Sequence, residues 1–234
     1  PLYFFKKNWQ EALKDRYKVN VLVDNRELTG APVVVEVNPT YYNLVGRVEY
    51  ETKMGVVSTD FTMIKPGALH RANGGYLILN ARDVLANIGA WEALKRVLKT
   101  RKLYIENLGE QYGLLAMASL KPQPIDIDVK VILVGNPLLY HLLYNFDEDF
   151  RKLFKVHADF DVEMENSLAN RKKLAGFISS TVRREKLKHF DRGACAKVVE
   201  YSSRLTGSQN KLTTRFNEIV ELICEADVWA GLEG

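Results

Sequence analysis

One run of residues, Lys65 to Arg82, constrains the fold of this chain more than any other. A Pro-Gly pair leads through a short segment to a Gly-Gly pair, and four apolar residues, Tyr76 to Leu79, follow directly. An apolar run bounded by turn residues is typical of a buried strand in a parallel sheet. Ligands of such sheets bind beyond the carboxyl ends of the strands. We therefore expect a site near Asn80 and Ala81, which come directly after this strand.

The pattern of apolar residues predicts an α/β region followed by a helical region. In the first region it predicts strands at 19–23, 32–37, 76–79 and 125–134, and helices at 4–16 and 81–100. Beyond residue 161 the pattern is helical throughout, with segments near 166–187, 192–206 and 213–230. We expect two domains: residues 1–160 with an α/β core, and residues 161–234 as a small all-helical domain.

Composition excludes several classes of protein. Apolar residues make up 47% of the chain and charged residues 26%, as in ordinary soluble globular proteins. The 33 basic and 29 acidic residues nearly balance, so nucleic-acid binding is not expected. The two cysteines, Cys195 and Cys224, argue against a disulfide framework and fit a reducing cytoplasm. No apolar stretch is long enough for a membrane span, and the four scattered histidines do not have the spacing of a metal site.

Several motifs together resemble one known family. The run Pro-Gly-Ala-Leu-His-Arg-Ala-Asn-Gly-Gly-Tyr-Leu from Pro66, with the apolar strand end after it, resembles the Walker B region of Lon-type AAA+ serine proteases. It is most similar to the Lon-like branch of archaeal and short bacterial forms. Further similar motifs lie at Leu44–Glu49, Trp91–Arg96, Val131–Asn136, Asp149–Phe154 and Leu212–Arg215. The resemblance covers residues 17 to 230 and implies a AAA+-like core, with a parallel sheet flanked by helices, followed by a helical lid.

The resemblance implies ATP and Mg²⁺ as cofactors, but the chain lacks groups that they require. In the family, the position of Asn80-Ala81 usually carries two carboxylates, one for Mg²⁺ and one that polarises water. Neither residue supplies a negative charge, so we expect slow or absent hydrolysis. The chain also has no glycine-rich P-loop motif, and Pro1 has no Met before it; we expect a longer polypeptide with the P-loop upstream. Alternatively, Asn80 simply caps a helix that begins at Ala81.

Three further residues match positions that contact nucleotide in the family. Asn136, after a predicted strand, matches the sensor-1 residue that detects the γ-phosphate, or else it caps a helix before Pro137. Arg151 matches the arginine finger that reaches a neighbouring subunit's nucleotide, or else it pairs with a carboxylate of its own Asp-Glu-Asp-Phe-Arg segment. Arg215 matches the sensor-2 arginine of the lid, or else it is an ordinary arginine on a helix surface.

The resemblance also places the contact with substrate. Phe61-Thr62-Met63 precedes Lys65-Pro66-Gly67 at an offset similar to that of the aromatic pore loop with which Lon proteins grip polypeptide; the alternative is an ordinary buried Phe61. The peptidase of the family uses a Ser activated by Lys in a domain C-terminal to the lid. The serines here lie in no nucleophile motif, among them Ser58, Ser119, Ser179 and Ser202. We expect no catalytic residue and no peptidase activity in this chain.

The function implied is that of a AAA+-like module in a Lon-type serine protease. It would form a homo-oligomeric ring and pass unfolded or flexible protein substrates to a downstream Ser-Lys peptidase domain. One alternative is an ATP-independent scaffold for oligomerisation and substrate gating, with a degenerate nucleotide site. Another is a AAA+ remodeller without a protease. A nucleic-acid-binding module is a more distant alternative, because no aromatic residues interleave the basic runs.

Overall fold

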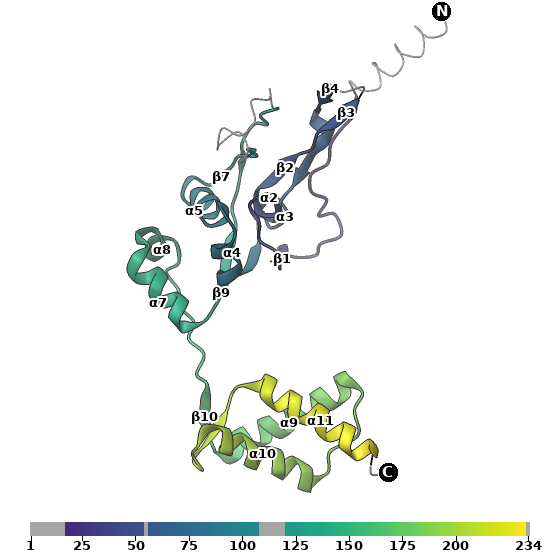
Figure 1. Cartoon of the computed structure of the whole chain (residues 1–234), viewed down its shortest axis with the longest axis vertical. Helices are drawn as coiled ribbons and strands as arrows, with labels where there is room; N and C mark the ends of the chain where they lie inside the picture. Colours follow the sequence, from purple (N-terminus) through teal and green to yellow (C-terminus); the bar gives the residue numbers. More distant parts are fainter. Residues whose placement is uncertain (1–16, 54–55, 108–119, 233–234) are drawn as a thin grey trace, which may run out of the picture. The chain divides into compact units, whose positions relative to one another are not determined.

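The computed structural model describes residues 17–53, 56–107 and 120–232. The chain separates into two units, Pro1–Lys155 and Val156–Gly234 (Figure 1). The predicted helix at 4–16 lies outside the described residues.

A three-stranded parallel sheet with the order β1-β6-β9 forms the centre of the first unit. Its strands are β1 (Val33–Glu36), β6 (Tyr76–Asn80) and β9 (Lys130–Val134). Ile78 of the central strand pairs with Val35 on one side and with Ile132 on the other. The apolar run after the Gly-Gly pair is therefore the middle strand of a parallel sheet, as predicted.

The Gly-Gly pair lets β6 begin against the residue before β1. The Tyr76 N–H donates to the Pro32 carbonyl at 2.8 Å. A Cβ placed on Gly75 would lie 2.0 Å from that same oxygen, so only glycine fits there. Gly74 adopts a φ of 79°, in the left-handed region that glycine tolerates best. The spacing of the two glycines thus sets where the central strand starts.

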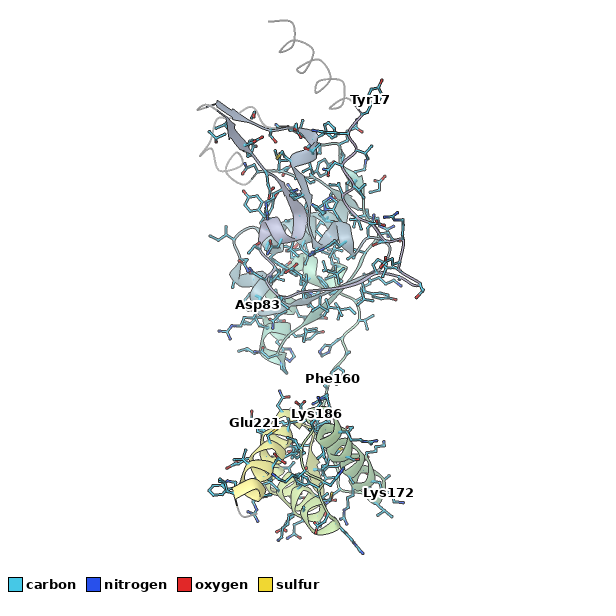
Figure 2. All side chains as sticks on the ribbon, turned by 90° about the vertical axis from the view of Figure 1, so that its right-hand side faces the viewer. Tyr17, Asp83, Phe160, Lys172, Lys186 and Glu221 are labelled. Atoms are coloured by element: carbon cyan, nitrogen blue, oxygen red, sulfur yellow. The ribbon has the colours of Figure 1, made fainter. Side chains whose placement is uncertain are left out.

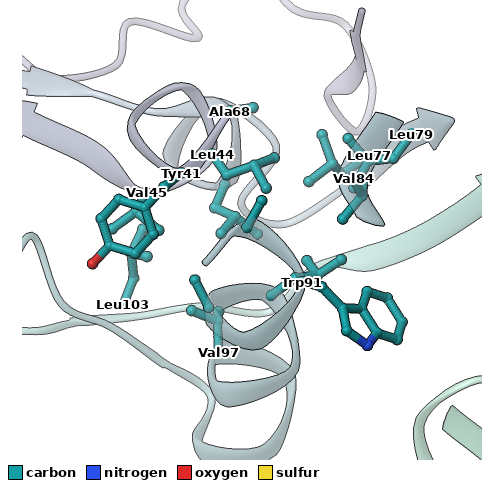
Figure 3. Close-up of a cluster of buried hydrophobic side chains, with 14 of the residues drawn as sticks. Tyr41, Leu44, Val45, Ala68, Leu77, Leu79, Val84, Trp91, Val97 and Leu103 are labelled. Carbon is teal, nitrogen blue, oxygen red and sulfur yellow. The ribbon is translucent and has the colours of Figure 1, made fainter. Parts of the chain in front are cut away.

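One face of the sheet carries the core of the first unit. Leu77 and Leu79 point to this face and are almost completely buried. They share a buried cluster with residues of α2 (Tyr41–Val45), α4 (Ala81–Ala86) and α5 (Ala90–Thr100), as Figure 3 shows. The helix α5 contributes Trp91, Leu94 and Val97 from a single stripe. Burying one such large apolar side chain stabilises the fold by about 2 kcal/mol, so α5 is held firmly on the sheet.

The opposite face of the sheet carries apolar side chains that are exposed in the part of the chain that the structure describes. The exposed fractions are 61% for Val33, 62% for Val35, 44% for Ile132 and 55% for Val134. These residues alternate along β1 and β9 with residues that face the core, as the two-residue period of a strand requires. Parallel sheets are usually covered on both faces. This face is therefore suited to packing against further protein.

Shorter elements surround the sheet. Between β1 and β6 the chain forms α3 (Ala68–Arg71), the antiparallel pair β2 (Gly46–Val48) with β5 (Ile64–Pro66), the hairpin β3 (Glu51–Lys53) with β4 (Val56–Ser58), and the 3-10 turn η1 (Phe61–Met63). Further along the chain follow β7 (Lys102–Leu103), β8 (Ile125–Asp126), α7 (Pro137–Phe146) and α8 (Glu148–Leu153).

Three elements predicted for the first unit are wrong in extent or existence. The helix expected at 81–100 is two helices, because Gly89 has a φ of 75° and begins α5 after a break. The strand expected at 125–134 is also divided: β8 pairs antiparallel with β7, and the chain turns before β9 joins the sheet. Residues 19–23 form no strand, since no described strand pairs with them and Val19 and Val21 are exposed.

The second unit contains the helices α9 (Leu168–Glu185), α10 (Arg192–Thr206) and α11 (Phe216–Leu232), close to the predicted bounds. Ser167 and Asp191 cap α9 and α10. The helices bury a small core of their own that includes Leu174, Ile178 and Ile223. Polar side chains such as Lys172 and Glu221 are exposed on α9 and α11 (Figure 2). This unit also contains two short strands, β10 (Glu163–Glu165) and β11 (Lys211–Thr213), which pair antiparallel. The helical pattern did not predict them.

In the described residues, no helix combines the length and the apolar composition that crossing a bilayer requires.

His70 of α3 makes the stability of the first unit depend on pH. Its ring is 5% exposed, and its Nδ1 accepts the Gly67 N–H at 3.2 Å, so the imidazole is neutral. Burial lowers the pKa of His70 from 6.5 to about 4. The unfolded chain takes up a proton below pH 6.5 that the folded chain takes up only near pH 4. The free energy of unfolding should therefore fall by about 3 kcal/mol as the pH falls through this window.

Urea unfolding of the chain at pH 7, 6, 5 and 4 measures this loss. The matched variant is His70→Asn, whose side-chain oxygen replaces the Nδ1 acceptor and does not titrate. Its free energy of unfolding should depend less on pH than that of the wild type over this range. Equal pH dependence in the two proteins would show that His70 is not the titrating group.

Candidate functional site

Asn80 and Asn136 lie at the carboxyl edge of the parallel sheet. Asn80 ends β6 and pairs in register with Val134 of β9, and Asn136 follows two residues later. The sheet therefore brings these two predicted site residues to one edge. In both side chains the amide oxygen caps the next helix. Asn80 Oδ1 accepts the Arg82 N–H at 2.9 Å, and Asn136 Oδ1 accepts the Leu139 N–H at 2.8 Å.

This capping determines what the edge can bind. Asn80 Oδ1 is the atom that could ligate Mg²⁺, and it is already engaged with the start of α4. The amide Nδ2 groups that remain are hydrogen-bond donors, which suit phosphate oxygens and not a metal ion. Ala81 is 6% exposed, and a Cβ on Gly135 would lie 3.2 Å from its methyl group, so little space for a carboxylate exists there. The edge therefore fits an anion and does not fit Mg²⁺.

Glu36 is a carboxylate near this edge that the sequence pattern did not indicate. Glu36 ends β1 and pairs in register with Leu79, next to Asn80. Its carboxylate is 2.9 Å from the Arg71 guanidinium and accepts the Asn38 N–H at 3.1 Å. It points to the face of Leu79, opposite to Asn80, as alternation along a strand requires. Glu36 therefore does not replace the missing acidic residue. Within the described ranges, no group of three or more His, Cys, Asp or Glu side chains could hold a metal ion.

Arg151 lies on α8 with its guanidinium over an aromatic ring. The central carbon of the guanidinium is 5.0 Å from the centroid of the Tyr144 ring. Among the described residues, no carboxylate pairs with Arg151, so the local ion pair that was its alternative role is absent. The two aspartates nearest in sequence are engaged by lysines of α5: Lys95 is 3.0 Å from Asp147, and Lys99 is 2.5 Å from Asp149.

Asp147 is a second residue that the sequence analysis missed. Its Oδ2 accepts hydrogen bonds from Trp91 Nε1 at 2.8 Å and Lys95 Nζ at 3.0 Å. Its Oδ1 accepts the N–H groups of Asp149 and Phe150, and so caps α8. Desolvation by itself raises the pKa of the Asp147 carboxyl, but these hydrogen bonds outweigh it and the pKa is lowered. One carboxylate thus joins α5 to the helix that carries Arg151.

The candidate pore-loop residues form the turn η1, between the hairpin β3–β4 and strand β5. Phe61 is 41% exposed, so the alternative of an ordinary buried phenylalanine is wrong. Asp60 Oδ1 accepts the Thr62 N–H at 2.7 Å and caps the turn. Asn20 Nδ2 donates to the carbonyls of Phe61 at 2.8 Å and Ile64 at 3.0 Å. Asn20 from a distant segment and Asp60, directly before the turn, thus hold a turn that presents an aromatic ring to solvent.

Arg215 lies in the second unit, just before α11. Its Nη1 is 3.3 Å from Glu218 Oε1, and both side chains are exposed. An exposed pair of this kind contributes little to stability, so the guanidinium is free to exchange Glu218 for another anion. The role of Arg215 at a nucleotide stays a prediction.

A cavity of about 590 Å³ lies in the first unit, away from the strand edge. Tyr42, Arg47, Tyr104 and Lys121 are among its lining residues. Its rim reaches Asn107 and Leu120, which adjoin residues outside the described ranges. We assign no function to this cavity.

Two family models match this chain in the order of its two units. One described as "LonB-like, AAA domain" matches residues 29–161, and one described as "Archaeal LonB, AAA+ ATPase LID domain" matches residues 189–234. Among curated proteins, the archaeal Lon protease of Archaeoglobus fulgidus is 26% identical over 228 residues, which cover 94% of this chain and 35% of that protein. The archaeal Lon protease of Thermoplasma volcanium is 26% identical over 165 residues, covering 68% of this chain and 24% of that protein.

This chain therefore spans about a third of the length of the archaeoglobal relative, and less of the other. Among solved structures, NtrX from Brucella abortus superposes with a TM-score of 0.50 at 18% identity, covering 84% of this chain and 41% of that protein. At this identity the likeness concerns the fold alone. With the two family models, it confirms the expected fold class, an α/β AAA+-like core followed by a helical lid.

Because Asp147 accepts hydrogen bonds from α5 and also caps α8, its loss should destabilise the fold much more than the loss of the neighbouring Asp149. Asp147→Ala should lower the free energy of unfolding by about 2 kcal/mol, because it removes the cap of α8 and leaves Trp91 Nε1 without its acceptor, while Lys95 keeps its ion pair with Glu92 at 2.8 Å. The control is Asp149→Ala on the same helix, which removes a more exposed ion pair and should cost less than about 1 kcal/mol. Urea unfolding measures both. Equal losses of unfolding free energy in the two variants would contradict the role of Asp147 as the link between α5 and α8.

Proposed function

This chain belongs to the LonB-like AAA family, and from that premise we propose that it is the AAA+ module of a Lon-type serine protease. In the longer polypeptide it forms a ring with copies of itself and delivers unfolded or flexible proteins to a Ser-Lys peptidase domain. The observation that carries this proposal is the edge formed by β6 and β9, where Asn80 pairs in register with Val134 and Asn136 follows two residues later. The exposed apolar face of the sheet also supports a module that works packed against other protein.

The same edge supports binding of ATP without efficient hydrolysis. When bound, ATP supplies a triphosphate whose oxygens can accept hydrogen bonds from the amide groups of Asn80 and Asn136. A P-loop elsewhere in the polypeptide provides the rest of the phosphate contacts. Arg151 contributes a guanidinium to the nucleotide of a neighbouring copy, and Arg215 contributes one from the lid. No side chain at Asn80 or Ala81 can hold a metal ion or orient an attacking water, so turnover is slow or absent.

The turn η1 supports contact with substrate. Phe61 is an exposed aromatic side chain on a turn that Asn20 and Asp60 hold in place. Phe61, Thr62 and Met63 of each copy would face the centre of the ring and contact an extended polypeptide. The two free cysteines fit a protein that works in the cytoplasm.

The runner-up is a scaffold for oligomerisation and gating that never uses nucleotide. The observation that favours it is the engagement of both amide oxygens of the strand edge in helix caps. A AAA+ remodeller without a protease is the other candidate. A Ser-Lys peptidase domain in the same reading frame would exclude the remodeller.

Calorimetric titration of the full-length protein with ATP separates the module from the scaffold. We expect ATP to bind, and to bind with similar affinity in Mg²⁺ and in EDTA, because Asn80 and Ala81, at the end of β6, carry no carboxylate. The variant Asn80→Asp keeps the cap of α4, since Asp and Asn cap equally well, and should make the affinity depend on Mg²⁺. Absence of ATP binding would favour the scaffold. A strong Mg²⁺ dependence in the wild type would refute our account of the edge.

A further inference from the structure

Arg151 is held by a contact that leaves all its hydrogen-bond donors available. Its guanidinium lies over the Tyr144 ring, with the central carbon 5.0 Å from the ring centroid. Such a contact uses the flat face of the cation. The five N–H groups of a guanidinium point outward in its plane. An ion pair with a carboxylate would have occupied two of these donors in a bidentate contact.

Two of the acidic residues near Arg151 in sequence are engaged by other groups. Asp147 and Asp149 are the closest aspartates in sequence, and Lys95 and Lys99 of α5 engage them. Asp147 also accepts hydrogen bonds from Trp91 and from the backbone of α8. Asp147 and Asp149 are therefore compensated by groups other than Arg151, and the exposed Glu148, three residues before Arg151, forms no ion pair with it in the described part of the chain.

The Tyr144 ring is itself fixed by a chain of aromatic contacts. It stacks on Tyr140, with 5.7 Å between the ring centroids and 30° between the planes. Tyr140 meets Phe150 edge to face at 5.9 Å, and Phe150 is 5% exposed in the core. Phe150 lies next to Arg151 on α8, which Asp147 caps. The Tyr144 ring and Arg151 are thus both linked to the buried Phe150, the ring through Tyr140 and the arginine through its neighbouring position on α8.

We propose that Tyr144 is the positioning residue of Arg151, and that it presents the guanidinium as a preformed fork for the phosphate of a nucleoside triphosphate on a neighbouring copy. This inference rests on the proposed function, in which Arg151 reaches that nucleotide. A free arginine side chain loses much conformational freedom when it binds an anion. A guanidinium that already lies on a ring loses less, and its planar fork can then form two parallel hydrogen bonds to phosphate oxygens.

The test uses the full-length protein and a fluorescent ATP analogue, titrated under conditions in which the ring is assembled. Four variants are compared with the wild type: Tyr144→Leu, Tyr144→Phe, Arg151→Ala and the double variant with Tyr144→Leu and Arg151→Ala. Tyr144 is 42% exposed, so leucine should be tolerated in α7. Thermal unfolding of each variant checks that the fold is kept.

We expect Arg151→Ala to weaken binding of the analogue about tenfold, as loss of a charged phosphate contact does. Tyr144→Leu should weaken it about two- to fivefold, the range of a single exposed cation–π contact. Tyr144→Phe should bind like the wild type, because the ring face is retained. The double variant should bind no more weakly than Arg151→Ala alone, because Tyr144 acts only through Arg151.

Each contrary result identifies which statement fails. If Arg151→Ala binds like the wild type, the arginine-finger role fails and the role of Tyr144 fails with it. If Arg151→Ala weakens binding while Tyr144→Leu does not, only the positioning role is overturned. The positioning role is also overturned if Tyr144→Phe is as weak as Tyr144→Leu, or if the two losses add in the double variant.

Discussion

The parallel pairing of β6 with β9 is the constraint on which the rest of the candidate site depends. It brings Asn80 beside Val134 and so places Asn80 and Asn136 at one edge, where each begins a helix. Both amide oxygens serve the backbones of those helices. An aspartate at position 80 could cap α4 and still carry a charge toward a metal ion, whereas asparagine offers only its amide donors. In the proposed function, this single side chain decides whether the edge suits phosphate or Mg²⁺.

A second constraint is the position of α5, which connects the strand edge to Arg151. The helix buries Trp91, Leu94 and Val97 in the core under the sheet. Trp91 and Lys95 of the same helix hold Asp147, the cap of α8. Packing of α5 on the sheet and hydrogen bonding to Asp147 therefore fix the position of α8, and of Arg151 on it, with respect to the strand edge.

Local patterns predicted much of this structure. The Gly-Gly pair and the apolar run after it identified the central strand, and caps such as Asp191 helped to place the helices of the second unit. Contacts between distant residues could not be predicted in the same way. Trp91 and Lys95 lie 56 and 52 residues from Asp147, so nothing near Asp147 in the sequence indicates its partners. The sequence likewise did not indicate that lysines of α5, rather than Arg151, engage Asp147 and Asp149.

The central claim is that the strand edge of this LonB-like module binds ATP but lacks the groups that hydrolyse it. Phosphate release from ATP by the full-length protein, with and without an unfolded protein substrate, tests this claim most directly. Our account predicts turnover near background in both conditions, far below the roughly 10 per second that is typical of enzymes. Turnover of several per second that is lost when the P-loop lysine is replaced would contradict it.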